Sequence, residues 1–395
     1  MTGNADGRGS GGHPCVLLSA GGTGGHLFPA EALATALRRL GIGVILATDR
    51  RAGSYAGSFP ADEIVRIAAA TPSGGSPVQM AKAAVMLGLG FVQASRALRR
   101  LRPAAVVGFG GYPTVPPVAA AAMLRIPTII HEQNGVMGRA NRFLARRVSA
   151  IATGFPEARG IPEGVAARVV HTGNPVRPAV LEAARMPYPA ALKGGKVRLL
   201  VFGGSQGARV MGDVVPAAVE RLPKELLPQL VVTQQAREED ALRVMKTYSR
   251  IIGHAEVQPF FKDLPKRMAE AHLVISRSGA STVAELAVIG RPSILVPLPG
   301  ALDQDQAANA EVLAAAGAAT VIPQAEFTPE RLATEIVARF EDPARLREAA
   351  EAAKGAGVAD AAERLAALVL HLARIPLPDE PRPEEEGSGG KQARE

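Results

Sequence analysis

Val16–His26 reads VLLSAGGTGGH, an apolar run that passes directly into a turn holding four glycines. The same arrangement recurs 182 positions later, where Arg198–Gly207 reads RLLVFGGSQG. An apolar run followed by glycines and then by a helix-length segment is typical of the first strand, turn and helix of a Rossmann-type domain. The repeat therefore predicts two similar Rossmann-type domains in tandem.

Beyond these two stretches, short apolar runs alternate with helix-length amphipathic segments along the chain. This alternation is typical of parallel sheets covered by helices, so the predicted fold class is α/β. The strands predicted in the first half are Val16–Ser19, Val44–Thr48, Ile64–Ala68, Ala105–Gly108, Thr128–His131, Ile151–Thr153 and Val169–His171. Those predicted in the second half are Arg198–Phe202, Leu230–Thr233, Glu256–Pro259, Leu273–Ser276, Ser293–Val296 and Thr320–Ile322. Pro29–Leu40 and Thr282–Ile289 are two of the predicted crossover helices.

Composition limits what the chain can be. Its 395 residues, 47% of them apolar, are enough for two buried cores. Cys15 is the only cysteine, which excludes an intrachain disulfide and a zinc ribbon and fits a reducing compartment. Residues 1–13 lack the apolar core of a signal peptide and are expected to be a disordered leader. The segment 376–395 is rich in Pro, Glu and Gly, which predicts a disordered tail.

Positive charge is concentrated in the first half of the chain. Residues 1–177 carry 19 Lys and Arg against 8 Asp and Glu, whereas residues 178–395 carry 26 against 29. This favours an anionic partner, namely nucleic acid, an acidic membrane surface or a phosphorylated substrate, unless it reflects only an arginine-rich composition. Because the chain has no Trp and only four Tyr, the stacking aromatics of nucleic-acid binders are scarce and we expect no nucleic-acid partner.

Two apolar segments bear on membrane binding. Pro103–Leu124 has no charge over 22 residues, but internal glycines and prolines predict a strand, a loop and an Ala-rich helix instead of a membrane span. Val78–Leu101 combines crowded apolar residues with arginines near its end, a cluster that Arg102 extends. This segment fits either a helix lying on an anionic membrane surface or a crossover helix packed on its own sheet.

The first glycine loop, Gly21–His26, allows backbone N–H groups to approach a ligand at a helix N-terminus, which suits a diphosphate. It lacks the lysine of a Walker A loop, and Leu27 breaks the glycine register of a dinucleotide fingerprint. A nicotinamide-dependent dehydrogenase with Asp49 as its ribose carboxylate is therefore disfavoured. His26 could take a proton from an attacking hydroxyl, bind phosphate, or serve only the structure.

Two more polar or glycine-rich groups follow predicted strands of the first half. Gly108–Thr114 contains a second glycine turn, and His131–Asn134 follows the next strand. The carboxyl ends of parallel strands meet at one edge of an open sheet, where such folds bind ligands. We therefore expect an extended, phosphate-bearing ligand here, although His131–Asn134 could also be only the start of a helix.

The second half repeats this chemistry. Gly203–Ala208 adds a serine hydroxyl to a glycine cradle. Ser276–Thr282 leads from a strand into a helix that carries Glu285, so phosphate could bind at the helix N-terminus and two ribose hydroxyls at the carboxylate. The amides and carboxylates of Asp303–Asn309 suit sugar hydroxyls. Together, these groups indicate binding of a nucleotide and of sugar hydroxyls.

With these motifs in this order, Cys15–Arg374 resembles the MurG family of glycosyltransferases. The motifs that carry the resemblance are Gly21–His26, Gly110–Tyr112, His131–Asn134, Gly173–Arg177, Gly203–Arg209, Arg277–Ala280 with Glu285, and Gln306 with Asn309. The chain departs from the family pattern at Asp305, where relatives carry His or Gln, and at Gly212, where Asn is usual.

The resemblance implies a GT-B fold, in which two Rossmann-like domains face each other across a cleft. The N-terminal, acceptor- and membrane-side domain would span residues 14–177 and be completed by a C-terminal helix at about 358–375. The domain that binds the donor, UDP-GlcNAc, would span residues 178–357.

The resemblance also implies roles for particular residues. The implied substrate-binding residues are Thr23, Gly24, Gly25, Asn134, Arg177, Ser205, Phe261, Ala280, Ser281, Thr282, Val283, Ala284, Glu285 and Gln306. Among them, Phe261 would lie by the uracil, the run from Ala280 to Glu285 by the diphosphate and ribose, and Gln306 by the sugar. The acceptor diphosphate would lie by the loops of Gly21, Gly22, Gly110, Gly111 and Tyr112. His26 would be the catalytic base or would orient the acceptor.

The implied reaction is attack by the C4 hydroxyl of MurNAc in lipid I, undecaprenyl-pyrophosphoryl-MurNAc-pentapeptide, on C1 of GlcNAc. It inverts the anomeric centre, expels UDP and gives lipid II for peptidoglycan synthesis. No cofactor or obligatory metal is expected, because helix N-termini, amides and arginine can stabilise the leaving diphosphate.

The resemblance further implies peripheral attachment to the anionic cytoplasmic face of the bacterial cell membrane, and proteins of cell-wall synthesis and division as partners. Two alternatives remain open: a related GT-B transferase with another lipid or small-molecule acceptor, and a scaffold that binds nucleotide-sugar without turnover.

Overall fold

A computed structural model describes residues 13–21, 24–49, 58–70, 76–190, 195–204, 207–300 and 305–376. Within these ranges the chain forms one seven-stranded and one six-stranded sheet, and every pair of neighbouring strands is parallel. Each strand predicted from the sequence overlaps one of these strands, so the predicted α/β class with two parallel sheets is confirmed.

The first sheet has the order β3-β2-β1-β4-β5-β6-β7. Its strands are β1 (Cys15–Ser19), β2 (Gly43–Thr48), β3 (Glu63–Arg66), β4 (Ala105–Gly108), β5 (Thr128–Glu132), β6 (Ala150–Thr153) and β7 (Val169–His171). The opening apolar run forms β1 at the centre, where Val16 pairs with Val44 on one side and Ala105 on the other. The order reverses at β1, and open sheets of this kind bind ligands at such a switch point.

Helices cover both faces of the first sheet. Val16 and Leu18 lie in the core beneath α1 (Gly24–Arg39) and α14 (Ala361–Ala373), whereas Leu17 lies in the core on the opposite face. That opposite face is covered by α3 (Pro77–Leu101), α4 (Val115–Met123) and α5 (Arg139–Leu144). The 3-10 turns η2 (Tyr112–Thr114) and η3 (Ala166–Arg168) precede α4 and β7. Because β1 is apolar on both faces, it reads as a continuous hydrophobic run.

The second sheet has the order β10-β9-β8-β11-β12-β13. Its strands are β8 (Val197–Phe202), β9 (Leu230–Gln235), β10 (His254–Gln258), β11 (Leu273–Ser276), β12 (Ser293–Leu295) and β13 (Ala319–Val321). One face is covered by α7 (Arg209–Val219), α8 (Glu238–Ile251) and α12 (Pro329–Phe340). The other is covered by α6 (Pro178–Ala183), α9 (Leu264–Glu270), α10 (Ala280–Ile289), α11 (Asp305–Ala315) and α13 (Pro343–Ala356). The short turns η4 (Leu227–Gln229) and η6 (Gln324–Glu326) precede β9 and α12.

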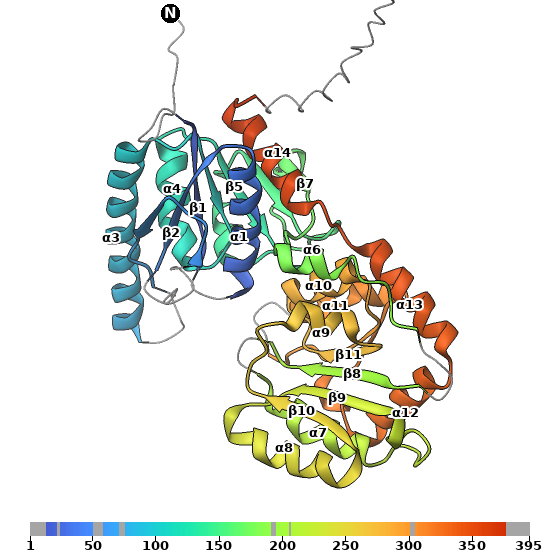
Figure 1. Cartoon of the computed structure of the whole chain (residues 1–395). Helices are drawn as coiled ribbons and strands as arrows, with labels where there is room; N and C mark the ends of the chain where they lie inside the picture. The colour runs from blue at the N-terminus through green and yellow to red at the C-terminus, as the bar shows by residue number, and fades with distance from the viewer. Residues whose placement is uncertain are drawn as a thin grey trace, which may run out of the picture.

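The two sheets form two lobes, and the chain crosses between them twice (Figure 1). The first crossing follows β7, and the second leads from α13 on the second lobe to α14, which packs on α1 of the first. The predicted boundary at residue 177 falls between β7 and β8. The last described helix, α14, therefore belongs to the same lobe as the first described strand, β1.

The two apolar segments have distinct structures. Pro103–Leu124 forms β4, η2 and α4, as predicted, and no helix in the described part of the chain is long and apolar enough to cross a membrane. Val78–Leu101 falls within α3, a crossover helix that begins with Pro77 at its first position and packs against α4. The interpretation of this segment as a crossover helix is thus confirmed, but its outer face is exposed and apolar at Val78, Met80, Val85, Leu89 and Val92.

The inner face of α3 closely approaches the segment that follows β3 at Gly90. A Cβ atom at Gly90 would lie 2.0 Å from the carbonyl oxygen of Ala68, whereas one at Gly88, two residues earlier, would meet nothing within 4 Å. We expect Gly90→Ala to lower the free energy of unfolding by about 1–3 kcal/mol, because the helix must shift outward. Gly88→Ala, the matched control, should raise it by about 0.5–1 kcal/mol through helix propensity. Urea unfolding measures both, and equal shifts for the two variants would contradict this packing.

Candidate active site

A cleft of about 710 Å³ lies between the two lobes and is lined by residues of both. The first lobe contributes the start of α1 and the loop after β5, and the second contributes the loops after β8, β11 and β12. All of these segments follow the carboxyl ends of parallel strands. The two sheets therefore present their ligand-binding edges to the same space.

Four helices begin at this cleft. First-turn residues of α1, α7, α10 and α11 all line it. The N-terminus of α10 is preceded by Gly279, whose position has open space around it, and no side chain caps the helix. Free N–H groups and the helix dipole make such ends favourable sites for anions. Their convergence suits a ligand with several negative charges, such as a diphosphate.

His26 lies in the first turn of α1, against both glycine loops of the first lobe. Cβ atoms built at Gly21, Gly110 and Gly111 would lie 3.6, 3.4 and 3.5 Å from its imidazole ring. Gly110 and Gly111 also have φ angles of +86° and +73°, which L side chains rarely adopt. The glycines are thus required both for the backbone path and for the position of the imidazole at the mouth of the cleft.

The loop after β5 is organised around the buried carboxylate of Glu132. It accepts hydrogen bonds from the backbone N–H groups of Asn134 and Gly138 and from the side-chain amides of Asn134 and Asn141. Burial raises the pKa of Glu132, and these four donors oppose that rise. The amide of Asn134 is thereby fixed at the cleft, which it lines.

His131, beside Glu132, is fully buried, and burial lowers its pKa to about 4. Its Nε2 lies 3.0 Å from the carbonyl oxygen of Gly173, on the chain that crosses to the second lobe. His131 therefore stays neutral near pH 7 and serves the loop and the crossing segment, while His26 is the histidine that faces the cleft.

Asn309 of α11 joins the two lobes directly. Its Oδ1 accepts from the backbone N–H of Gly135 at 2.7 Å, and its Nδ2 donates to Asn134 Oδ1 and to the Ser278 carbonyl, both at 3.1 Å. The side chain is completely buried. The oxygen and the nitrogen of this amide are thus both hydrogen-bonded. The bonds to Gly135 and Asn134 cross between the lobes, and the second of them orients the amide of Asn134.

Arg177 and Glu285 form an ion pair of 3.2 Å at the edge of the cleft. Arg177 ends the first crossing segment, and Glu285 lies on α10, one turn beyond its N-terminus. Burial raises the pKa of Glu285, and the adjacent guanidinium opposes that rise. The guanidinium of Arg177 also lies over the ring of Phe28 from α1, with Cζ 4.0 Å from the ring centroid.

Most of the residues predicted from the sequence lie at or beside this cleft. Those that line it directly are Gly24, Gly25, His26, Asn134, Ala280, Ser281, Thr282 and Gln306. Arg177 and Glu285 lie beside it, Gly21, Gly110 and Gly111 contact His26, Tyr112 begins η2, and Val283 and Ala284 continue α10. Phe261 is not among the described lining residues, because its ring is buried under the guanidinium of Arg267. Gly22, Thr23 and Ser205 lie outside the described residues.

The cleft also contains residues that the sequence did not single out as ligand contacts, among them Phe28, Arg237 and Gln324. Arg237 follows β9 and Gln324 follows β13, so their position just after a predicted strand is the sequence feature that could have indicated a place at the cleft. Arg277, quoted as part of a motif, is held by the carbonyl oxygens of Val296 and Pro297 and by Gln324. Its charge has no carboxylate partner within the described ranges, which adds a positive potential beside α10. Within those ranges there is also no group of three or more metal-ligating side chains.

Comparison with known proteins gives a consistent result. Residues 16–153 match the glycosyltransferase family 28 N-terminal domain, and residues 198–365 match the glycosyltransferase family 28 C-terminal domain. The chain is 64% identical over 361 residues to the UDP-N-acetylglucosamine–N-acetylmuramyl-(pentapeptide) pyrophosphoryl-undecaprenol N-acetylglucosamine transferase of Methylorubrum populi, covering 91% of this chain and 98% of that protein. It is 58% identical over 362 residues to the protein of the same name from Rhodopseudomonas palustris, covering 92% and 99%.

Among solved structures, the crystal structure of Acinetobacter baumannii MurG superposes with a TM-score of 0.74 at 30% identity, covering 91% of this chain and 99% of that one. The two facing Rossmann-like lobes, the cleft and the domain matches define a glycosyltransferase of GT-B architecture. The chain belongs to glycosyltransferase family 28 and, within it, to the MurG family.

The interlobe bonds of Asn309 generate a stability prediction. Asn309→Ala leaves the buried N–H of Gly135 and the buried carbonyl of Ser278 without this partner, so we expect the free energy of unfolding to fall by about 1–3 kcal/mol. Gln229→Ala removes an amide that bonds to Glu225 at the surface and should change it by less than about 0.5 kcal/mol. Urea unfolding compares the two variants, and an Asn309 variant as stable as the wild type would contradict the role of this bond.

Proposed function

We propose that this protein transfers GlcNAc from UDP-GlcNAc to the C4 hydroxyl of MurNAc in lipid I, which gives lipid II. The observation that carries the proposal is the cleft in which the N-terminus of α10 faces His26 and the first turn of α1 on the other lobe, with the Arg177–Glu285 ion pair beside it. The names of the relatives that are 58% and 64% identical support the same donor and acceptor.

The donor occupies the side of the cleft formed by the second lobe. Its diphosphate lies at the N–H groups that begin α10, and the ribose hydroxyls bond to Glu285 one turn later. Gln306 at the start of α11 contacts the sugar in this proposal, and Asn134 contacts the donor from the first lobe; both residues line the cleft, which supports these roles. Ser205 and Phe261 remain predicted contacts of the nucleotide.

The acceptor approaches from the first lobe, with its diphosphate beside the loops of Gly21 and of Gly110 and Gly111. The C4 oxygen of MurNAc forms a bond to C1 of GlcNAc from the face opposite UDP, so the bond from C1 to the diphosphate oxygen breaks and the anomeric centre inverts. The hydroxyl proton passes to a base, for which His26 is the candidate because its imidazole lies between the two glycine loops. UDP departs with the bonding electrons.

The leaving diphosphate is stabilised by protein groups. The uncapped N-terminus of α10 and the nearby guanidiniums of Arg177 and Arg277 supply positive potential without a change of charge on the protein. We therefore propose that no metal is obligatory. Asp303 and Asp305 have the D-x-D spacing of some metal-binding sites, so activity in the presence of a chelator tests this part of the proposal.

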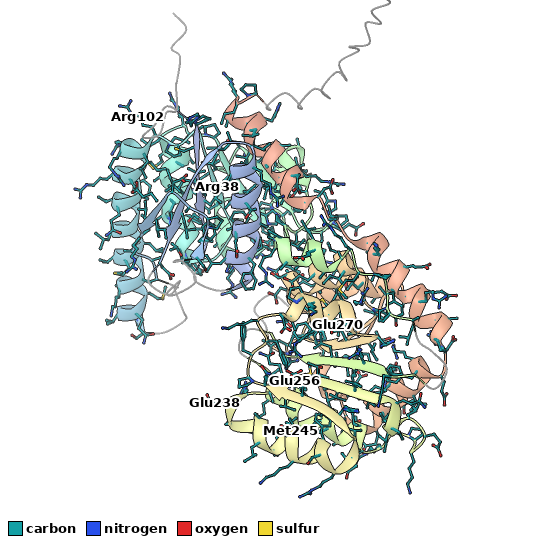
Figure 2. All side chains as sticks on the ribbon, in the orientation of Figure 1. Arg38, Arg102, Glu238, Met245, Glu256 and Glu270 are labelled. Carbon is teal, nitrogen blue, oxygen red and sulfur yellow. The ribbon has the colours of Figure 1, made fainter. Side chains whose placement is uncertain are left out.

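The proposed location is the cytoplasmic face of the cell membrane, where the protein is held peripherally. The support comes from α3, whose exposed apolar residues run along one helix that ends in an arginine cluster. Arg102 closes that cluster at the rim of the first lobe (Figure 2). An apolar face beside basic residues suits binding to anionic lipid. At that membrane, proteins of cell-wall synthesis and division are the proposed protein partners.

We expect the wild type to transfer GlcNAc from UDP-GlcNAc to a short-chain lipid I analogue, and to do so equally well in EDTA. Glu285→Ala should raise the KM for UDP-GlcNAc by about 10-fold or more, because two ribose hydrogen bonds to a charged group are lost. His26→Ala should lower kcat by about 100-fold or more with little effect on donor affinity, because the base is removed. Radiolabel transfer measures all three rates.

If UDP-GlcNAc binds but the analogue is never glycosylated, a related transferase with another acceptor replaces this proposal. Loss of activity in EDTA would overturn the proposal that no metal is obligatory.

Membrane attachment is tested by flotation with vesicles that contain anionic lipid. The wild type should float with them at low salt and be released at high salt. Replacing both Val78 and Val85, which are 75% and 70% exposed, by Glu should lower the bound fraction by about 10-fold. The control Leu242→Glu alters a residue on α8 of the other lobe that is 67% exposed and should change nothing. A wild type without salt-sensitive flotation would contradict the proposal.

A further inference from the structure

Phe28 is an aromatic residue of the cleft to which the mechanism above assigns no role. It lies in the second turn of α1 and lines the cleft from the first lobe. Its ring contacts the first glycine loop, since a Cβ atom at Gly24 would lie 3.2 Å from Cε2 of Phe28. The guanidinium of Arg177 lies over the ring of Phe28, with Cζ 4.0 Å from the ring centroid. A guanidinium this close to an aromatic face is held by a cation–π interaction.

Arg177 is held between two lobes. Phe28 belongs to the first lobe, whereas Glu285, which accepts from Arg177 Nη2 at 3.2 Å, belongs to α10 of the second. Glu31, one turn beyond Phe28 on α1, also lies near enough for the Arg177 charge to oppose the rise in pKa that burial causes. The guanidinium therefore has an aromatic face on one side and carboxylates from both lobes around it.

The orientation of this guanidinium depends on few contacts. Its Nε is buried and has no hydrogen-bond partner among the described residues, and its Nη2 donates a single hydrogen bond to Glu285. Arginine side chains have many rotamers, so fixing one costs conformational entropy unless a rigid surface restricts it. The ring of Phe28 is the rigid surface in contact with it.

We propose that Phe28 is a positioning residue for donor binding. Its ring holds the guanidinium of Arg177 in one orientation, and in that orientation Arg177 bonds to the carboxylate of Glu285 and fixes its position. This rests on the proposed function, in which Glu285 receives the ribose. When ribose hydroxyls engage that carboxylate, the guanidinium stays over the ring and keeps the carboxylate charged and oriented. The first lobe thereby contributes to donor affinity through Arg177.

The test is the affinity for free UDP, measured by titration calorimetry. Phe28→Leu keeps an apolar side chain but removes the aromatic face, so the Kd for UDP should rise about threefold to thirtyfold. Phe28→Tyr keeps the face and should bind UDP within about twofold of the wild type. In an Arg177→Gln background, Phe28→Leu should cause no further rise, because the residue through which it acts is gone.

The matched control is Phe143→Leu, which removes a second phenylalanine covered by an arginine, Arg147, at 5.1 Å on the surface of the same lobe. It should leave the Kd for UDP unchanged. If Phe28→Leu lowers the thermal midpoint, Phe28→Met, which retains more side-chain volume, takes its place in the cycle.

An unchanged Kd in Phe28→Leu would overturn the inference, and so would an effect that adds in full to that of Arg177→Gln. Equal losses for the Leu and Tyr variants would overturn it as well, since the aromatic face would then be irrelevant. A wild type that binds no UDP would instead contradict the proposed function, so the two failures are distinguishable.

Discussion

The buried amide of Asn309 is the contact on which the geometry of the cleft depends. It bonds to Gly135 and Asn134 of one lobe and to Ser278 of its own, so a single buried side chain connects the two ligand-binding edges, which the ion pair of Arg159 with Glu311 also joins at the surface. The approach is close because Gly135 has no side chain: a Cβ there would lie 3.1 Å from Cβ of Ala308. If the lobes separated, Asn134 and His26 would no longer face α10, and neither lobe alone contains both halves of the site.

In the proposed function, the cleft binds negative charge mainly through backbone groups. Helices α1, α7, α10 and α11 all start there, and glycines keep their approaches open. Charged side chains play a complementary part. Arg277 adds a buried positive charge beside α10, and Arg177 links α1 to Glu285. This division suits a ligand whose diphosphate is the same in substrate and product, and in the proposed function Gln306 and Asn134 contact the sugar that is transferred.

Much of this structure could be predicted from the sequence, because its signals are local. Apolar runs such as Val16–Ser19 predict strands, and a glycine turn after a strand predicts where the ligand binds. Phe28 carries no such signal, because it lies inside the first helix. Arg237 and Gln324 follow predicted strands, but no motif at either position indicates that the side chain lines the cleft. The sequence could not show whether α3 packs on its own domain or lies on a membrane. The helix has apolar residues on both sides: Gly90 faces the segment after β3, whereas Val85 and Leu89 face outward. Pairings between lobes, such as that of Asn309 with Gly135, depend on residues 174 positions apart and leave no local signal.

The central assignment is that a nucleoside diphosphate binds across the start of α10, between the lobes. A crystal structure of the wild-type protein with UDP tests this most directly. The predicted result places the diphosphate at the backbone N–H groups of residues 280–282 and both ribose hydroxyls within hydrogen-bond distance of Glu285. A structure in which UDP lies instead on the first glycine loop of the N-terminal lobe, with α10 and Glu285 free of ligand, would contradict it.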